Sequence, residues 1–317
     1  MSVQTGMRWV VVHFGWDVTV HTVTEAQNGH GLVRDLRGEG KYTTTLRWCF
    51  LVLLTAFCSE ASSARGDNNG RGTKAVSLGN SFVSLADNCW AIVYNPAGLA
   101  QMTSTRASVF FVPQQFGLPE LRTVAAAVVI PVGSFVTGLE VEQFGFDLYK
   151  ETGLRFGVAS LVDEHISAGA TLNLTRITID RYGSQTTATV DIGLLARVHE
   201  NLKLGFSYLN SLGARVGVVG EQLPQVFLLG ASYSIEKDLV LVGEIEKDIR
   251  YETIVKGGIE QSLFDFLRLR LGLSNNPDKL AGGFSLKYSN AEFGYAGYSH
   301  PDLGWTHQLE MSFVILP

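Results

Sequence analysis

The strongest constraint on the fold is a period-2 alternation of apolar and polar residues that runs from Arg106 almost to the end of the chain. In the stretch 267–274, leucine occupies every second position, and Arg268 and Arg270 lie between the leucines. A β-strand points successive side chains to opposite faces, so this pattern predicts a strand with one apolar face. The same alternation recurs in the stretches 166–175, 202–208 and 280–288.

The number and length of these runs favour a membrane barrel. Turn-forming residues divide the region into about fourteen runs of about nine to twelve residues, near the roughly nine to eleven that a tilted strand needs to cross a bilayer. Hydrophobic residues make up 46% of the chain and charged residues 17%. Because unpaired backbone groups find no water in lipid, such apolar strands must close on themselves. We therefore predict an all-β fold, a transmembrane antiparallel β-barrel of about fourteen strands over residues 105–317.

The charged residues of the predicted strands share the less apolar register. A charge at the bilayer midplane costs roughly 2–4 kcal/mol on the lipid face of a barrel, so these side chains are expected to point inward. Their signs are mixed, which favours paired charges over an ion-selective pore. The predicted lumen-lining charges are Glu140, Glu142, Arg155, Glu244, Glu246, Arg268 and Arg270, and Lys256, Glu260 and Glu310 share their register. Interfacial aromatics are predicted at Tyr182, Tyr208, Tyr251, Tyr288, Tyr298 and Trp305.

Residues 41–64 match an export leader. A basic residue, Arg47, precedes about ten mostly apolar residues, too few to span a bilayer, and the small residues Ser62-Ser63-Ala64 follow. We predict a signal peptide cleaved after Ala64, which leaves Cys89 as the one cysteine of the mature chain and excludes an intramolecular disulfide. Residues 1–40 match neither a leader nor a domain. They are expected to be a non-native or disordered extension, with the true translation start downstream of Met1.

A compact unit without strands is predicted at residues 65–104. It contains Asn95-Pro96-Ala97-Gly98, which cannot continue a helix or a sheet ladder because proline lacks an N–H and asparagine and glycine favour turns. The sequence therefore places a short helical plug before the first barrel strand.

The chain carries no recognisable catalytic motif. It lacks a Gly-x-Ser-x-Gly elbow, a phosphate-binding loop and a His-x-x-x-His pair. Two i,i+2 pairs, Glu140 with Glu142 and Glu244 with Glu246, have the composition of a hydrolase dyad, but an inward charge ladder explains them better. No enzyme activity, metal or cofactor is predicted. A net charge of −5 with scattered Lys and Arg argues against a nucleic-acid partner.

Two segments resemble one family. Residues 79–100, ending in the Asn-Pro-Ala-Gly-Leu turn, and residues 302–313, with Thr306-His307, are similar to the ends of FadL-like outer-membrane barrels, especially the PorV/PorQ branch. The resemblance implies a fourteen-stranded barrel whose N-terminal segment is a hatch in the lumen. It also implies that Asn95, Pro96, Ala97 and Gly98 form the turn that gates ligand passage.

Three functions follow from these expectations, all in the outer membrane. The first is binding or transport of long-chain fatty acids or other hydrophobic small molecules past the hatch, with sideways exit at a strand irregularity near Pro113. The alternatives are a PorV-like surface-attachment barrel that binds secreted proteins of a secretion system, and a purely structural barrel. The expected partners are membrane lipids, a long-chain fatty acid, the barrel-assembly machinery and secreted proteins.

Overall fold

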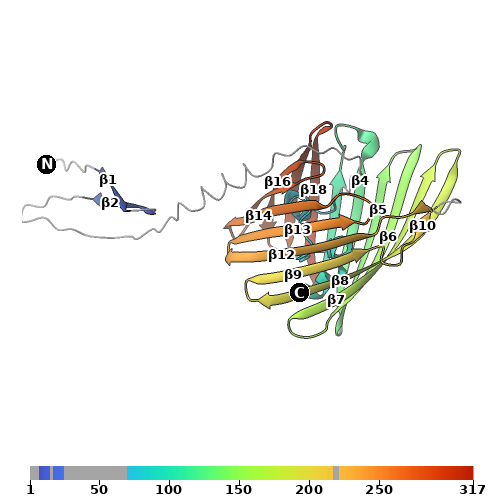
Figure 1. Cartoon of the computed structure of the whole chain (residues 1–317), viewed down its shortest axis with the longest axis horizontal. Coiled ribbons are helices and arrows are strands. Elements are labelled where there is room, and N and C mark those ends of the chain that lie inside the picture. Colours follow the sequence, from blue (N-terminus) through green and yellow to red (C-terminus); the bar gives the residue numbers. More distant parts are fainter. Residues whose placement is uncertain (1–6, 15–16, 25–69, 217–220, 317) are drawn as a thin grey trace, which may run out of the picture. The chain divides into compact units, whose positions relative to one another are not determined.

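The computed structural model describes residues 7–14, 17–24, 70–216 and 221–316 (Figure 1). It divides into two units, Met1–Glu60 and Ala61–Pro317. In the first unit, β1 (Met7–Phe14) and β2 (Asp17–Thr24) form an antiparallel hairpin within the stretch 1–40. The leader predicted at 41–64 lies outside the described residues.

In the described part of the second unit, fourteen strands form one closed barrel in which every neighbouring pair is hydrogen-bonded. This confirms the predicted fold class. The strands are β3 (Thr105–Val112), β4 (Thr123–Val132), β5 (Phe135–Gly145), β6 (Tyr149–Leu161), β7 (Ile166–Ile179), β8 (Gly183–His199), β9 (Leu202–Leu209), β12 (Val226–Glu236), β13 (Leu239–Asp248), β14 (Ile254–Phe264), β15 (Leu267–Ser274), β16 (Lys279–Tyr288), β17 (Ala291–His300) and β18 (Gly304–Leu316). All pairs are antiparallel, and the pairing of β18 with β3 joins the last strand of the barrel to the first. Strand lengths range from 8 to 17 residues, wider than predicted.

The two ends of the barrel differ. At one end, which we call the turn end, tight turns such as 133–134 and 289–290 join consecutive strands. At the other, the loop end, lie the two longest connections, 113–122 and 210–225. The first holds the 3-10 turn η2 (Pro119–Leu121), and the second holds a small hairpin of β10 (Arg215–Val216) and β11 (Glu221–Gln222).

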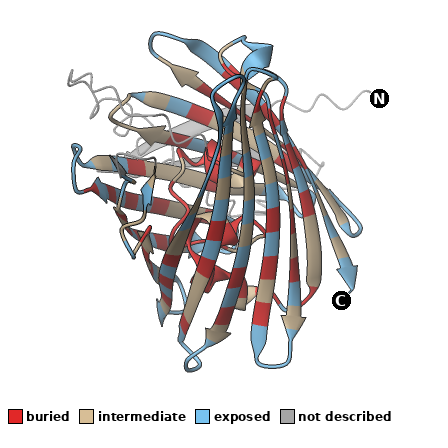
Figure 2. Ribbon diagram, turned by 90° about the vertical axis from the view of Figure 1, so that its right-hand side faces the viewer, coloured by how far each residue is buried: buried red, intermediate tan, exposed pale blue. Residues whose placement is uncertain are grey.

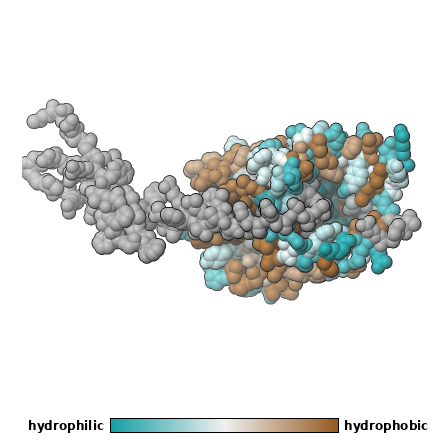
Figure 3. Space-filling view, turned by 45° about the horizontal axis from the view of Figure 1, so that its top comes forward, coloured by the Kyte–Doolittle hydropathy of each residue, from teal (hydrophilic) through white to brown (hydrophobic). Residues whose placement is uncertain are grey.

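Side chains alternate between an apolar outside and a more polar inside. In β15, Arg270 is 2% exposed, whereas its neighbours Leu269 and Leu271 are 43% and 39% exposed. Figure 2 shows this alternation as bands along the strands, and Figure 3 shows apolar side chains gathered on parts of the outer surface. In the part of the chain that is described, no helix has the length and apolarity needed to cross a membrane.

Two local expectations are wrong. Tyr298 does not belong to an outer aromatic girdle: it is 4% exposed and packs inside the barrel against Phe116, because it shares the inward register of Ala296. Pro113 does not interrupt a strand, since β3 ends at Val112.

Residues 70–104, here called the inner segment, lie inside the barrel. They form α2 (Thr73–Ser77), α3 (Ala91–Tyr94) and the 3-10 helix η1 (Pro96–Gln101), and they contact β5–β8 on one side and β15–β18 on the other. Such short helices gain little from backbone propensity, so packing against the wall must hold them. Their apolar side chains supply most of the barrel core.

Candidate functional site

The Asn95 turn is the most tightly enclosed part of the inner segment. Asn95 is fully buried; its Nδ2 donates to the carbonyl oxygens of Val83 (2.8 Å) and Leu194 (3.0 Å). Its Oδ1 accepts from the Ala97 N–H at 3.1 Å, which caps η1, and Pro96 takes the first helical position. Asn95 thus fixes the turn internally and ties it to β8.

Glycines of the wall make room for this turn. A Cβ placed on Gly193 would lie 2.1 Å from Asn95 Oδ1, and one on Gly169 would lie 2.5 Å from the Pro96 carbonyl carbon. Gly98 of the turn packs against another part of the inner segment, since a Cβ placed on it would lie 2.2 Å from the Ala86 carbonyl oxygen. The sequence showed these strand glycines only as small residues on the polar register; their contact with the inner segment depends on the tertiary fold.

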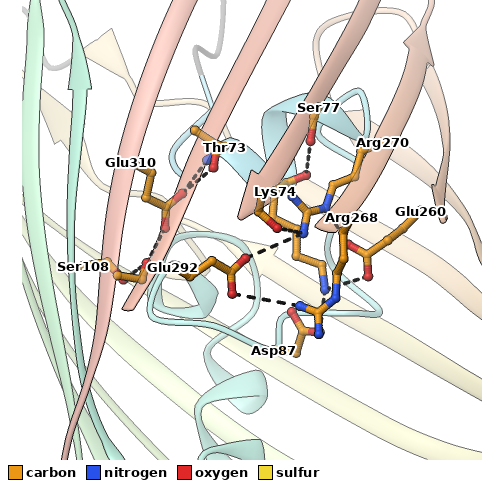
Figure 4. Close-up of polar contacts among 12 residues, drawn as sticks. Thr73, Lys74, Ser77, Asp87, Ser108, Glu260, Arg268, Arg270, Glu292 and Glu310 are labelled. Atoms are coloured by element: carbon orange, nitrogen blue, oxygen red, sulfur yellow. Dashed lines mark hydrogen bonds and ion pairs between the residues drawn. The ribbon is translucent and has the colours of Figure 1, made fainter. Parts of the chain in front are cut away.

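Two wall carboxylates hold the backbone of the inner segment. Glu310 on β18 accepts from the Thr73 N–H (2.6 Å), the Thr73 hydroxyl (2.8 Å) and the indole N–H of Trp90 (2.7 Å). Glu244 on β13 accepts from the N–H groups of Phe82 and Val83, both at 2.9 Å. Figure 4 shows Glu310 directed at Thr73. Hydrogen bonds to ionised carboxylates are stronger than neutral ones, so these contacts anchor the segment.

The predicted lumen charges form ion pairs between adjacent strands. Arg155 on β6 lies 2.6 Å from Glu140 and 3.0 Å from Glu142 on β5. Arg71 of the inner segment also pairs with Glu142. The i,i+2 carboxylates therefore share a cation instead of forming a hydrolase dyad.

The other predicted charges pair in the same way. Lys256 on β14 lies 2.8 Å from Glu244 and 2.6 Å from Glu246. On β15, Arg270 pairs with Glu260, while Arg268 lies 3.9 Å from Glu292 (Figure 4).

Lys74 and Asp87 join two parts of the inner segment at 2.7 Å, and Lys74 also lies 3.4 Å from Glu260. Burial opposes the charge of both groups, but the pair overcomes it: Asp87 and Glu260 raise the pKa of Lys74, and Lys74 lowers the pKa of Asp87. Burial also lowers the pKa of Arg71 to about 10 and raises that of Cys89 to about 11. Lys74 and Asp87 are therefore both charged near neutral pH, and the Cys89 thiol is protonated.

Two cavities lie at the ends of the inner segment. One, of about 90 Å³ and of mixed polar and apolar lining, lies at the loop end between Arg71, Lys256 and residues 274–277. The other, of about 320 Å³, lies at the turn end and is bordered by Lys74, Asp87 and Glu292. Buried apolar side chains of the inner segment lie in the lumen, and the ring centroids of Trp90 and Phe110 are 5.6 Å apart in an edge-to-face contact.

Other chemistry finds little support in the described residues. No group of three His, Cys, Asp or Glu side chains there has metal-binding geometry. His307 faces outward, and its Nδ1 forms a 2.7 Å hydrogen bond with the Tyr295 hydroxyl.

No family model and no curated protein matches the chain. Solved structures share its fold. The toluene transporter TodX of P. putida has a TM-score of 0.61 at 13% identity, over 79% of this chain and 100% of its own. The CymD monoaromatic hydrocarbon channel gives 0.60 at 12% identity, over 78% and 98%, and a Pseudomonas aeruginosa FadL homologue gives 0.57 at 11%, over 76% and 98%. At these identities the likeness shows only that the chain shares the barrel fold of these three proteins, and it gives no support to the PorV/PorQ branch.

Proposed function

We propose that this chain is an outer-membrane channel for hydrophobic small molecules, with the inner segment as its hatch. The observation that supports this proposal most directly is that the inner segment lies in the lumen of a closed fourteen-stranded barrel and is anchored to its wall by hydrogen bonds. The neighbours of similar fold are named as toluene and monoaromatic hydrocarbon transporters, which supports an apolar ligand. On the sequence resemblance, we propose long-chain fatty acids as the specific ligand class.

The two ends of the barrel suggest its orientation. Outer-membrane barrels have short periplasmic turns and longer outer loops, so the loop end faces outward in this proposal. Export through the predicted leader at 41–64 and insertion by the barrel-assembly machinery complete it. The mass of the protein purified from outer membranes tests cleavage after Ala64.

Uptake distinguishes the ligand classes. A strain that lacks the chain and the same strain with the wild-type chain are given labelled oleate or labelled toluene. The proposal expects faster uptake of at least one label with the wild-type chain. Equal uptake of both labels in the two strains would remove the transport function.

A surface-attachment barrel that binds secreted proteins is the second candidate. Two observations favour it: the two cavities are small, and the charges that line the lumen are paired. Cross-linking in cells separates the candidates, since a secreted protein cross-linked to the loop end supports this function and a retained lipid supports transport.

A further inference from the structure

The outward face of strand β7 changes from apolar to cationic at one position. From the turn end, its outward register carries the apolar side chains Ile166, Ala168, Ala170, Leu172 and Leu174. The next outward residue is Arg176, which lies about 25 Å above Ile166 at about 2.5 Å of height per residue of a tilted strand. The apolar band of outer-membrane barrels is also about 25 Å tall. Arg176 therefore lies where the hydrocarbon of the membrane gives way to lipid head groups.

Neighbouring strands place a second cation and several hydroxyls at this level. Lys150 on β6 pairs with Thr178 and Thr152 pairs with Arg176, so the two cations are diagonal neighbours, roughly 7–8 Å apart and within reach of one ligand. Strand β8, with 17 residues against 8 in β9, extends past β9 at the loop end and brings Ser184 opposite Thr178. Arg176 Nη2 donates to Ser184 Oγ at 2.9 Å, which directs the guanidinium toward the loop end. We call these five residues the outer cation patch.

The charges on the outward register of the barrel share one sign and one end. If the first and last residue of each strand are set aside, the Lys, Arg, Asp and Glu residues on this register of the described strands are Lys150, Arg176 and Lys247. All three lie near the loop end. On the lipid face a carboxylate costs no more than a cation, so desolvation does not explain why these strands carry only cations there. An anionic leaflet at the loop end explains it, because such a leaflet attracts cations and repels carboxylates.

We infer that the outer cation patch binds the phosphorylated head group of an anionic lipid in the leaflet at the loop end. Among the described residues, Lys150 and Arg176 form no ion pair, and the neighbour that Arg176 contacts is a neutral hydroxyl. A guanidinium offers parallel N–H donors to a phosphate, and Lys150 adds a point charge. Leu154 and Leu174, paired directly below, face the acyl chains. Binding here rests on the proposed orientation of the barrel and not on transport.

Native mass spectrometry of the purified full chain in detergent measures how many lipids stay bound at each lipid concentration. The probes are diphosphoryl lipid A and the same lipid without its phosphates. Arg176→Gln is the test variant. Lys247→Gln is the matched control, because it removes one cation of the same register and end on the distant strand β13, where the Lys247 Nζ donates to the Tyr251 carbonyl oxygen at 2.7 Å.

The wild type should bind diphosphoryl lipid A saturably and at least tenfold more tightly than the phosphate-free lipid. Arg176→Gln should weaken this binding at least about fivefold, whereas Lys247→Gln should stay within twofold of the wild type. Equal affinity of the wild type for the two lipids, or equal affinity of the two variants for diphosphoryl lipid A, would overturn the inference. The comparison of the two lipids needs only the wild type, so it decides the matter even where a variant fails to fold. Uptake is not measured, so a chain that transports nothing can still pass this test.

Discussion

Replacing Glu310 by alanine should release the N-terminal part of the inner segment. Glu310 satisfies two buried donors that cannot rotate to another acceptor, the Thr73 N–H and the Trp90 indole N–H. A buried donor left without a partner costs about 1–3 kcal/mol, so the substitution should destabilise the docked segment by about 2–6 kcal/mol. Exchange of the Thr73 amide, if it requires local opening, should accelerate at least about 30-fold.

Hydrogen exchange with peptide-level mass spectrometry measures this effect in the intact barrel. Glu292→Ala is the matched control, because Glu292 borders the same cavity yet pairs only with arginines of the wall, at 3.9 Å. In the Glu292→Ala variant, the rate of hydrogen exchange in residues 73–90 should stay within about threefold of the wild-type rate. An equally small change in Glu310→Ala, with the barrel folded, would refute the anchoring role.

Three further predictions concern the inner segment. Gly193→Ala should lower the denaturation midpoint, because its Cβ would lie 2.1 Å from a buried side-chain oxygen of the turn, whereas Gly243→Ala, with open space around its Cβ, should not; equal midpoints would contradict the glycine fit. The lowered pKa of Asp87 means that its stabilising contribution is present above about pH 4 and is lost as the pH falls through that pKa, so acid should speed exchange of the segment, and Asp87→Asn should flatten this dependence. Cys89, with its pKa raised by burial to about 11, should react with maleimide at pH 8 far more slowly than a free thiol, and labelling at the rate of an exposed cysteine would contradict its burial.

Sequence alone predicted the barrel because alternation is a local property. Leu269 and Leu271 lie outside and Arg270 inside, as period 2 requires. The partners of the inward charges were not predictable, since a one-residue change of register exchanges the faces of a strand. Glu310 and Thr73 are 237 residues apart, and only closure of β18 on β3 and the path of the inner segment bring them together.

The extension of β8 and the role of the wall glycines escaped prediction for a similar reason. Residues 183–190 alternate too weakly to show where the neighbouring strand ends, and Gly193 looks like any small residue on the inward register. Tyr298 was misplaced because position near a strand end does not decide which face a side chain takes.

The central claim is that the inner segment must move for a ligand to pass, and one substitution tests it. Cys89 of the inner segment and Ser108 on β3 border the same cavity at the turn end. Ser108→Cys is therefore designed to cross-link the inner segment to the wall, and it closes a loop whose cross-link is worth about 3 kcal/mol. Uptake of labelled toluene or oleate, whichever the wild type transports, should fall at least tenfold when this variant is oxidised and recover on reduction. The Cys89→Ser, Ser108→Cys double variant should not respond to oxidant. Full uptake by the oxidised, cross-linked variant would contradict the account.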